Sequence, residues 1–267
     1  MPLTAAPPPS ASHTEAVQRR RLRRELAEAV RRGELALHYQ PRICLRSNAQ
    51  LGAEALARWP HRRRGLLAPG TFLPLAEAAG LTADIGAWVL HAACTAAAGW
   101  PGELGVSVNV AAAQLAGDHL ADQLAAALER SALPPERLTL EFGEAVLADL
   151  GLDALLTLSA IRDLGVGLAV DKFGHGPASV SLLRQLPLTT LKLDRMLLRD
   201  AADNVEDRAI LRALTQAGHA LGLVVVADGV ETWEQRGLLL EIGCDAAQGY
   251  LFSAAVPETG FAAKLRQ

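Results

Sequence analysis

The chain has 267 residues, a formal net charge of -3 and 50% hydrophobic residues. This composition suffices for one large domain with a sizeable core and excludes a chain that is disordered throughout. The net charge gives no support to nucleic-acid binding through bulk positive charge. Three distant cysteines, Cys44, Cys94 and Cys244, argue against a disulfide framework or a zinc knuckle, and we expect a reducing compartment, the cytoplasm.

The first segment of the chain predicts a tail and then a helix. Residues 1–16 hold three consecutive prolines and predict a flexible tail without the pattern of a secretory signal, and no later run is apolar and long enough for a membrane span. Residues 17–32 predict a helix with one apolar face and arginines on the other. This helix either leads, solvated, into the domain or contacts an acidic partner or membrane surface, and the sequence leaves both open.

Strands and helices are predicted to alternate along the rest of the chain. Short β-type runs predict strands at 35–45, 52–59, 105–110, 138–143, 167–173, 189–194, 222–228 and 246–252. Helical spacing predicts helices at 73–98, 111–131, 152–164, 204–220 and 232–242. The alternation favours an α/β fold, a (β/α)8 TIM-type barrel that forms a single domain over 17–267. The connection around Asn48 is too short for a parallel crossover, so the first strand should be antiparallel.

Polar residues stand at or just beyond the carboxyl ends of seven of these strands. They are Glu54, Asn109, Glu141, Glu144, Asp171, Lys172, Lys192, Asp194, Asp228, Glu231 and Gln248. One such residue alone would more simply be a helix N-cap or a buried hydrogen-bonding group. In a parallel barrel, however, these ends converge on the face where barrel enzymes build their sites, so the whole set predicts one shared site.

The residue types at these ends indicate a class of chemistry. Converging carboxylates repel one another unless a positive charge lies among them. Oxygen ligands with one amide suit Mg²⁺, Mn²⁺ or Ca²⁺, and no His or Cys is placed to favour zinc. Carboxylates, a divalent ion and a lysine together suit hydrolysis of a phosphate ester.

At these positions the chain resembles the EAL domain family of cyclic di-GMP phosphodiesterases. The resemblance extends over about residues 22–257, and its motifs appear in order: YQP (39–41), EALARW (54–59), NVAAAQL (109–115), LEFGE (140–144), DKFGHG (171–176), LKLDR (191–195), ADGVET (227–232) and QGYLF (248–252). It implies a (β/α)8 barrel with an antiparallel first strand and hydrolysis of cyclic di-GMP to pGpG with Mg²⁺ or Mn²⁺.

The resemblance also implies a role for each matching residue. The implied metal ligands are Glu54, Asn109, Glu141 and Asp171. The implied catalytic residues are Lys192, which helps to hold the attacking water, Asp228 and Gln248. The implied lining of the dinucleotide groove is Gln40, Leu56, Arg58, Asp194, Glu231 and Tyr250. Glu144 resembles the acid that anchors the loop after the 167–173 strand.

The sequence departs from the family pattern at several of these positions. Lys172 stands where the family usually has a second adjacent aspartate, which reverses the charge of a ligand and predicts loss of the second metal site. The Lys172 ammonium could replace that ion as a ligand-binding charge, or could extend into solvent on its long stem. Asp228 replaces a glutamate, Gly143 replaces a threonine, and the 174–180 loop, with His175 and Pro177, differs from the usual type.

Three functions follow from the resemblance and its departures. The first is a catalytically impaired domain that acts as a cyclic di-GMP receptor or regulator. The second is an active Mg- or Mn-dependent phosphodiesterase, and the third is an adaptor that works through a protein surface without ligand or metal. We expect cyclic di-GMP as the partner, no nucleic acid and no membrane span, while a homodimer or a protein partner stays open.

Overall fold

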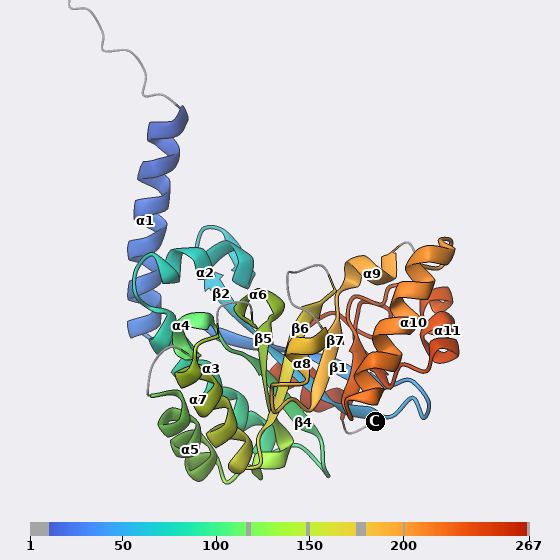
Figure 1. The fold of residues 1–267 in the computed structure, drawn as a ribbon. Helices are drawn as coiled ribbons and strands as arrows, with labels where there is room; N and C mark the ends of the chain where they lie inside the picture. The colour runs from blue at the N-terminus through green and yellow to red at the C-terminus, as the bar shows by residue number, and fades with distance from the viewer. Residues whose placement is uncertain (1–10, 116–118, 148–149, 175–179, 200, 266–267) are drawn as a thin grey trace, which may run out of the picture. The chain divides into compact units, whose positions relative to one another are not determined.

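The computed structural model describes residues 11–115, 119–147, 150–174, 180–199 and 201–265 (Figure 1). Its contacts group the described residues into two compact units. Unit 1 comprises the described part of Met1–Ala36 with Ala57–Ile85, and unit 2 comprises Leu37–Leu56 with the described part of Gly86–Gln267. The single domain over 17–267 stays a prediction.

A closed mixed barrel of eight strands forms within the described residues. The strands are β1 (Ala36–Cys44), β2 (Gln50–His61), β4 (Gly105–Asn109), β5 (Leu138–Gly143), β6 (Gly167–Phe173), β7 (Thr190–Leu193), β8 (Val224–Ala227) and β9 (Ala246–Ala247). Each strand in the order β2, β4, β5, β6, β7, β8, β9 pairs in parallel with the next one. Strand β1 pairs antiparallel with β9 and also pairs with β2, which closes the barrel. The predicted TIM-type barrel with an antiparallel first strand is therefore confirmed.

The tight turn between β1 and β2 explains the antiparallel start. Asn48 adopts a left-handed backbone conformation with φ 59°, which asparagine tolerates better than most residues. Its N–H donates to the Cys44 carbonyl at 2.9 Å, and the Cys44 N–H donates to the Ala49 carbonyl at 2.8 Å. Such a turn can only join antiparallel neighbours, as the sequence predicts.

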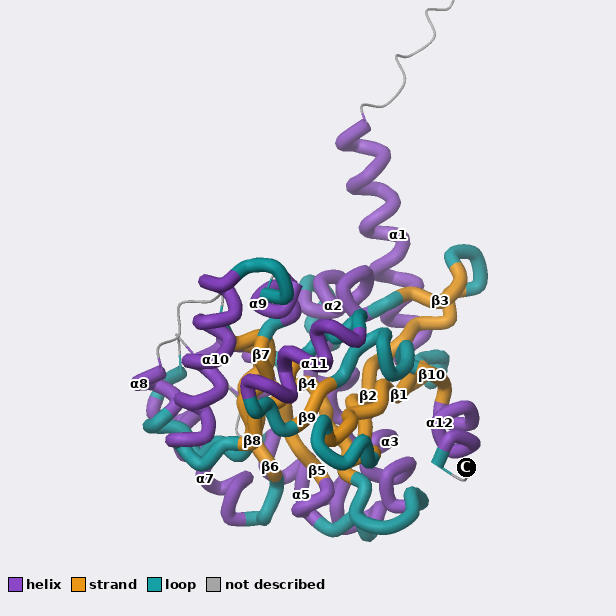
Figure 2. The backbone as a smooth tube through the Cα atoms, turned by 90° about the vertical axis from the view of Figure 1, so that its right-hand side faces the viewer, coloured by secondary structure: helices purple, strands orange, loops and turns teal. Residues whose placement is uncertain are grey.

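Helices surround the strands of unit 2, as Figures 1 and 2 show. They are α3 (Thr82–Ala98), α4 (Ala112–Leu115), α5 (Leu120–Ser131), α6 (Glu144–Leu147), α7 (Leu152–Asp163), α8 (Val180–Leu183), α9 (Arg195–Arg199), α10 (Val205–Ala220), α11 (Trp233–Ile242) and α12 (Glu258–Lys264). A 3-10 turn covers Pro135–Arg137, and β10 (Val256–Pro257) pairs antiparallel with β1. No described helix is long and apolar enough to cross a bilayer.

Unit 1 holds α1 (Ala11–Arg31), α2 (Pro69–Glu77) and a hairpin made by the end of β2 and β3 (Gly65–Leu67). Helix α1 begins at Ala11 instead of the predicted residue 17, so residues 11–16 of the predicted tail belong to α1. Its apolar face buries Leu22 and Leu26. In the same unit Trp59 meets Phe72 edge-on, with ring centroids 6.3 Å apart. The predicted 73–98 helix is interrupted at Gly80, whose φ is 68°.

We predict that the close approach of β2 to β4 makes Gly52 indispensable. A Cβ on Gly52 would lie 2.0 Å from the carbonyl oxygen of Gly105, its partner on β4. Gly52→Ala should therefore lower the free energy of unfolding by about 3 kcal/mol, the upper end of overpacking. The matched control is Gly237→Ala in α11, where a Cβ meets open space and removal of a helical glycine should stabilise by about 0.5–1 kcal/mol. Urea unfolding measures both, and similar effects of the two substitutions would contradict the prediction.

Candidate functional site

The predicted strand-end residues meet around one buried lysine in unit 2. Lys192 on β7 donates from Nζ to Glu54 Oε2 at 2.8 Å and to Glu141 Oε2, and lies 3.3 Å from Asp171 Oδ1. The lysine and its three carboxylate partners, from β2, β5 and β6, are all buried. The convergence predicted from the sequence is therefore confirmed for these four residues.

Glu54 connects the lysine to two amides. Asn109 Nδ2 donates to Glu54 Oε1 at 2.7 Å, and Gln248 Nε2 donates to Glu54 Oε2 at 2.6 Å. Burial alone would raise the pKa of Glu54, but the charge of Lys192 and these hydrogen bonds outweigh it and hold the pKa at about 2. Glu54 is therefore ionised at neutral pH.

Burial raises the pKa of two other carboxylates near Lys192, those of Glu141 and Asp228. Burial and the neighbouring charge of Glu54 raise the pKa of Glu141 to about 7, against the attraction of Lys192. Burial also raises the pKa of Asp228, again against Lys192; its Oδ1 accepts the Gly229 N–H at 2.8 Å. Burial would lower the pKa of Lys192, but the surrounding carboxylates raise it well above its usual value, so the lysine stays charged.

The donor set fits a hard divalent cation. Glu141 Oε1 is buried without a hydrogen-bond partner, and Asp171 Oδ1 meets Lys192 without hydrogen-bond geometry. Buried oxygens that lack a donor are suited to a metal ion. In the described part of the chain, no three His, Cys, Asp or Glu side chains are arranged as around an ion. The Lys192 ammonium pairs instead with all three carboxylates.

The predicted groove residues lie outside this cluster. Gln40 is half-buried and donates from Nε2 to the Ser253 carbonyl at 3.2 Å. Asp194 Oδ1 accepts the Met196 N–H at 2.7 Å, within the first turn of α9. Tyr250 is 72% exposed.

The remaining groove residues divide between the two units. Leu56 is half-buried and belongs to unit 2. Glu231 is exposed and lies in unit 2, beside a cavity of about 200 Å³ that Arg195 and Gln235 also line. Arg58 belongs to unit 1, where its guanidinium donates to the Ala57 carbonyl at 2.9 Å.

Lys172 follows the buried Asp171 directly and is exposed. Its φ of 59° is left-handed, and the β6–β7 register shifts between Val170 and Phe173, so the lysine sits on a β-bulge. Bulges reorient side chains. Here Asp171 faces the buried cluster, and its neighbour Lys172 faces the solvent. Lys172 therefore contributes no contact to the Lys192 cluster.

Glu144 ties the end of β5 to the segment after β6. Its buried side chain accepts the Gly174 N–H at 3.0 Å through Oε2. This contact agrees in position with the predicted loop anchor, and the anchoring role itself stays a prediction. His175 and Pro177 of the predicted loop lie outside the described residues.

Arg42 is a residue near the site that the sequence analysis missed. It lies on β1, where Nη1 donates to Ser107 Oγ at 3.3 Å. Burial lowers the pKa of Arg42, while the charges of Glu141 and Glu54 raise it, so the guanidinium lies within electrostatic reach of two of the carboxylates that contact Lys192. A charged residue inside the alternating 35–45 strand was the available signal.

A family model described as the EAL domain matches residues 23–255, and the chain belongs to this family. Among curated relatives, the bifunctional diguanylate cyclase/cyclic di-GMP phosphodiesterase MucR of Pseudomonas aeruginosa is 37% identical over 252 residues, which are 93% of this chain and 37% of the relative. The oxygen sensor protein DosP of Escherichia coli is 36% identical over 236 residues, 87% of this chain and 30% of the relative. The chain thus spans about a third of these relatives.

Solved structures agree with the family. A structure titled as the PaMucR phosphodiesterase in complex with c-di-GMP has a TM-score of 0.86 and 38% identity, and the match covers 90% of this chain and 99% of that one. The FimX EAL domain from Pseudomonas aeruginosa bound to c-di-GMP has a TM-score of 0.81 and 26% identity, covering 86% and 94% of the two chains.

We predict that Arg42 tunes the acidity of the cluster. Arg42→Ala removes a positive charge within electrostatic reach of Glu54 and Glu141, so the pKa of Glu141 should rise further. Because a metal ion binds the deprotonated carboxylate, the pH midpoint of Mn²⁺ uptake should rise by about one unit. Arg42→Lys keeps the charge and should restore most of the shift. Calorimetric titration with Mn²⁺ across pH measures this, and identical midpoints in all three proteins would refute it.

Proposed function

We propose that this chain is a cyclic di-GMP signalling domain that binds the dinucleotide and hydrolyses it slowly or not at all. The carrying observation is Lys172, an ammonium directly after Asp171 where the family pattern has a second carboxylate. It supports loss of the second metal site, because position 172 offers a second divalent ion no carboxylate oxygen, the ligand that such an ion prefers.

The chain keeps the residues that would hold one ion. Glu54, Asn109, Glu141 and Asp171 would ligate Mg²⁺ or Mn²⁺ through oxygen atoms. The ion, when bound, supplies Lewis-acid polarisation of a phosphoryl oxygen.

The other polar residues of the cluster orient and charge this ligand set. Lys192 keeps a proton at Nζ and fixes the carboxylates of Glu54 and Glu141, and Gln248 keeps Glu54 oriented and ionised. Asp228 has a raised pKa and stands beside the cluster as a proton acceptor, one methylene shorter than the family's glutamate.

Ligand binding needs positive charge for two phosphates. The exposed Lys172 ammonium is available in unit 2 to meet a phosphate as a point charge. Arg58 in unit 1 stays a proposed contact that could form a two-point fork. Relatives and neighbours described as cyclic di-GMP phosphodiesterases or as bound to c-di-GMP support this ligand.

An active Mg- or Mn-dependent phosphodiesterase is the second candidate. The intact cluster around Lys192 favours it, because every oxygen ligand for a first ion is present and its three carboxylates, Glu54, Glu141 and Asp171, are buried. A ligand-free adaptor is the third. We further propose a cytoplasmic location, in keeping with three free cysteines, while a homodimer and a protein partner stay proposals.

We predict that charge reversal at Lys172 recovers catalysis. Wild-type protein should release pGpG far below roughly 1 s⁻¹, the low end of working enzymes. Lys172→Asp, alone or with Asp228→Glu, should raise the rate by about 100-fold or more, because a lost metal interaction is worth several kcal/mol in the transition state. The charge-matched control is Arg184→Asp, an exposed arginine of unit 2, which should leave the rate unchanged. Chromatographic assay of pGpG measures all four proteins, and a wild type near 1 s⁻¹ would establish the enzyme instead.

Calorimetry separates the receptor from the adaptor. Cyclic di-GMP should bind with little dependence on Mg²⁺, and the affinity should fall with added salt because charged groups receive the phosphates. Lack of saturation up to millimolar ligand, with and without Mg²⁺, would leave the adaptor as the function.

A further inference from the structure

Charge is distributed very unevenly between the two units. Unit 1 carries 11 of the 26 basic residues and six of the 29 acidic ones, a net charge of +5. Unit 2 carries the other 15 basic and 23 acidic residues, a net charge of -8. An asymmetry of this kind within one chain indicates a polyanionic partner for the basic part.

The fold of unit 1 gathers two arginine segments that lie far apart in the sequence. The first is on α1, where Arg19, Arg20, Arg23 and Arg24 are exposed, while Leu22 and Leu26 are buried. The second is the exposed turn 62–64 between β2 and β3, which Figure 2 shows beside α1. We call these seven arginines the basic surface.

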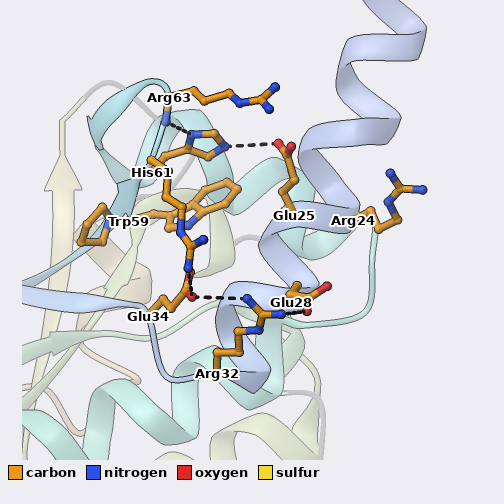
Figure 3. Close-up of a pocket in the computed structure, with 10 residues that line it drawn as sticks. Arg24, Glu25, Glu28, Arg32, Glu34, Trp59, His61 and Arg63 are labelled. Carbon is orange, nitrogen blue, oxygen red and sulfur yellow. Dashed lines mark hydrogen bonds and ion pairs between the residues drawn. The ribbon is translucent and has the colours of Figure 1, made fainter.

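Side-chain contacts join the two segments. His61 on β2 reaches Glu25 on α1 at 3.2 Å, and Arg62 pairs with Glu34 at 3.3 Å. Figure 3 shows the cavity of about 330 Å³ between the segments, which Arg24, Arg32, Arg62 and Arg63 line together with three glutamates.

Several arginines of the basic surface keep their charge available. No described acidic side chain pairs with Arg24, Arg63 or Arg64. The Arg62–Glu34 pair is largely exposed, and exposed pairs contribute little, so it can exchange for another anion. These four arginines, on α1 and on the 62–64 turn, present forked guanidinium groups, which suit binding to phosphate groups.

The non-polar side chains of unit 1 distinguish between polyanions. Leu66, two residues after the arginine turn, is 52% exposed, and Leu73 on α2 and Val17 on α1 are also exposed. The aromatic residues of the described unit, Trp59 and Phe72, are buried and offer no face for stacking bases. Arginines beside exposed aliphatic side chains are typical of a surface that binds a bilayer of anionic phospholipids.

We propose that the basic surface binds the headgroups of anionic phospholipids, with Leu66 entering the interface. The contact is peripheral. The arginines bind lipid phosphates, and burial of the leucine side chain in the interface adds a small favourable free energy. The proposal is independent of the cyclic di-GMP site, because every residue it uses belongs to unit 1 and lies outside the Lys192 cluster.

Co-sedimentation of the full chain with vesicles tests the proposal. Wild type should bind phosphatidylcholine vesicles containing about a third phosphatidylglycerol, should not bind phosphatidylcholine alone, and should be released by high salt. Arg62→Gln/Arg63→Gln/Arg64→Gln should reduce the partition coefficient about 100-fold, at about fivefold for each basic residue near the surface. Leu66→Ser should reduce it several-fold with an unchanged salt dependence.

A matched variant separates location from total charge. Arg46→Gln/Arg130→Gln/Arg184→Gln removes three exposed charges from unit 2 and should leave vesicle binding at the wild-type level. Circular dichroism and the melting temperature confirm that the variants fold. Equal loss in both triple variants, binding to neutral vesicles, no binding at low salt, or tighter binding to duplex DNA or single-stranded RNA than to the anionic vesicles would each overturn the proposal.

Discussion

The barrel interior depends on the ion pairs between the buried ammonium of Lys192 and three carboxylates. The ammonium lies among Glu54, Glu141 and Asp171, which would otherwise be like charges in a buried space. Desolvation of such a set is expensive, and removal of one partner from a buried ion pair typically costs 3–5 kcal/mol. Strands β2, β5, β6 and β7 are therefore held together by charge at this cluster, and the same arrangement leaves oxygen atoms free for a cation.

Much of this fold and site could be predicted from the sequence, for a physical reason. The 138–143 and 167–173 runs match β5 and β6, because central parallel strands are apolar on both faces and show as continuous runs. The two-residue β9 and the break at Gly80 were not predicted, since short elements depend on tertiary contacts. The order of strand ends predicted which residues would meet, because the topology alone fixes that edge.

The remaining details of the site depend on side-chain geometry that the sequence does not contain. Pattern and spacing do not indicate that Glu54 accepts from an ammonium and two amides while Glu141 keeps one oxygen without a partner. They also do not indicate that Arg42, from the antiparallel strand, lies within electrostatic reach of Glu54 and Glu141. At Lys172 the sequence predicted a reversed ligand charge, and the bulge determines that the side chain is exposed.

The central claim is that this chain can hold one divalent ion and not two. The most direct measurement is the number of Mn²⁺ ions bound per chain in the presence of cyclic di-GMP, by equilibrium dialysis with electron paramagnetic resonance. The account predicts one ion for the wild type and no spectral coupling between manganese centres, because position 172 offers no carboxylate oxygen to a second ion. Two coupled ions per chain in the wild type would contradict it.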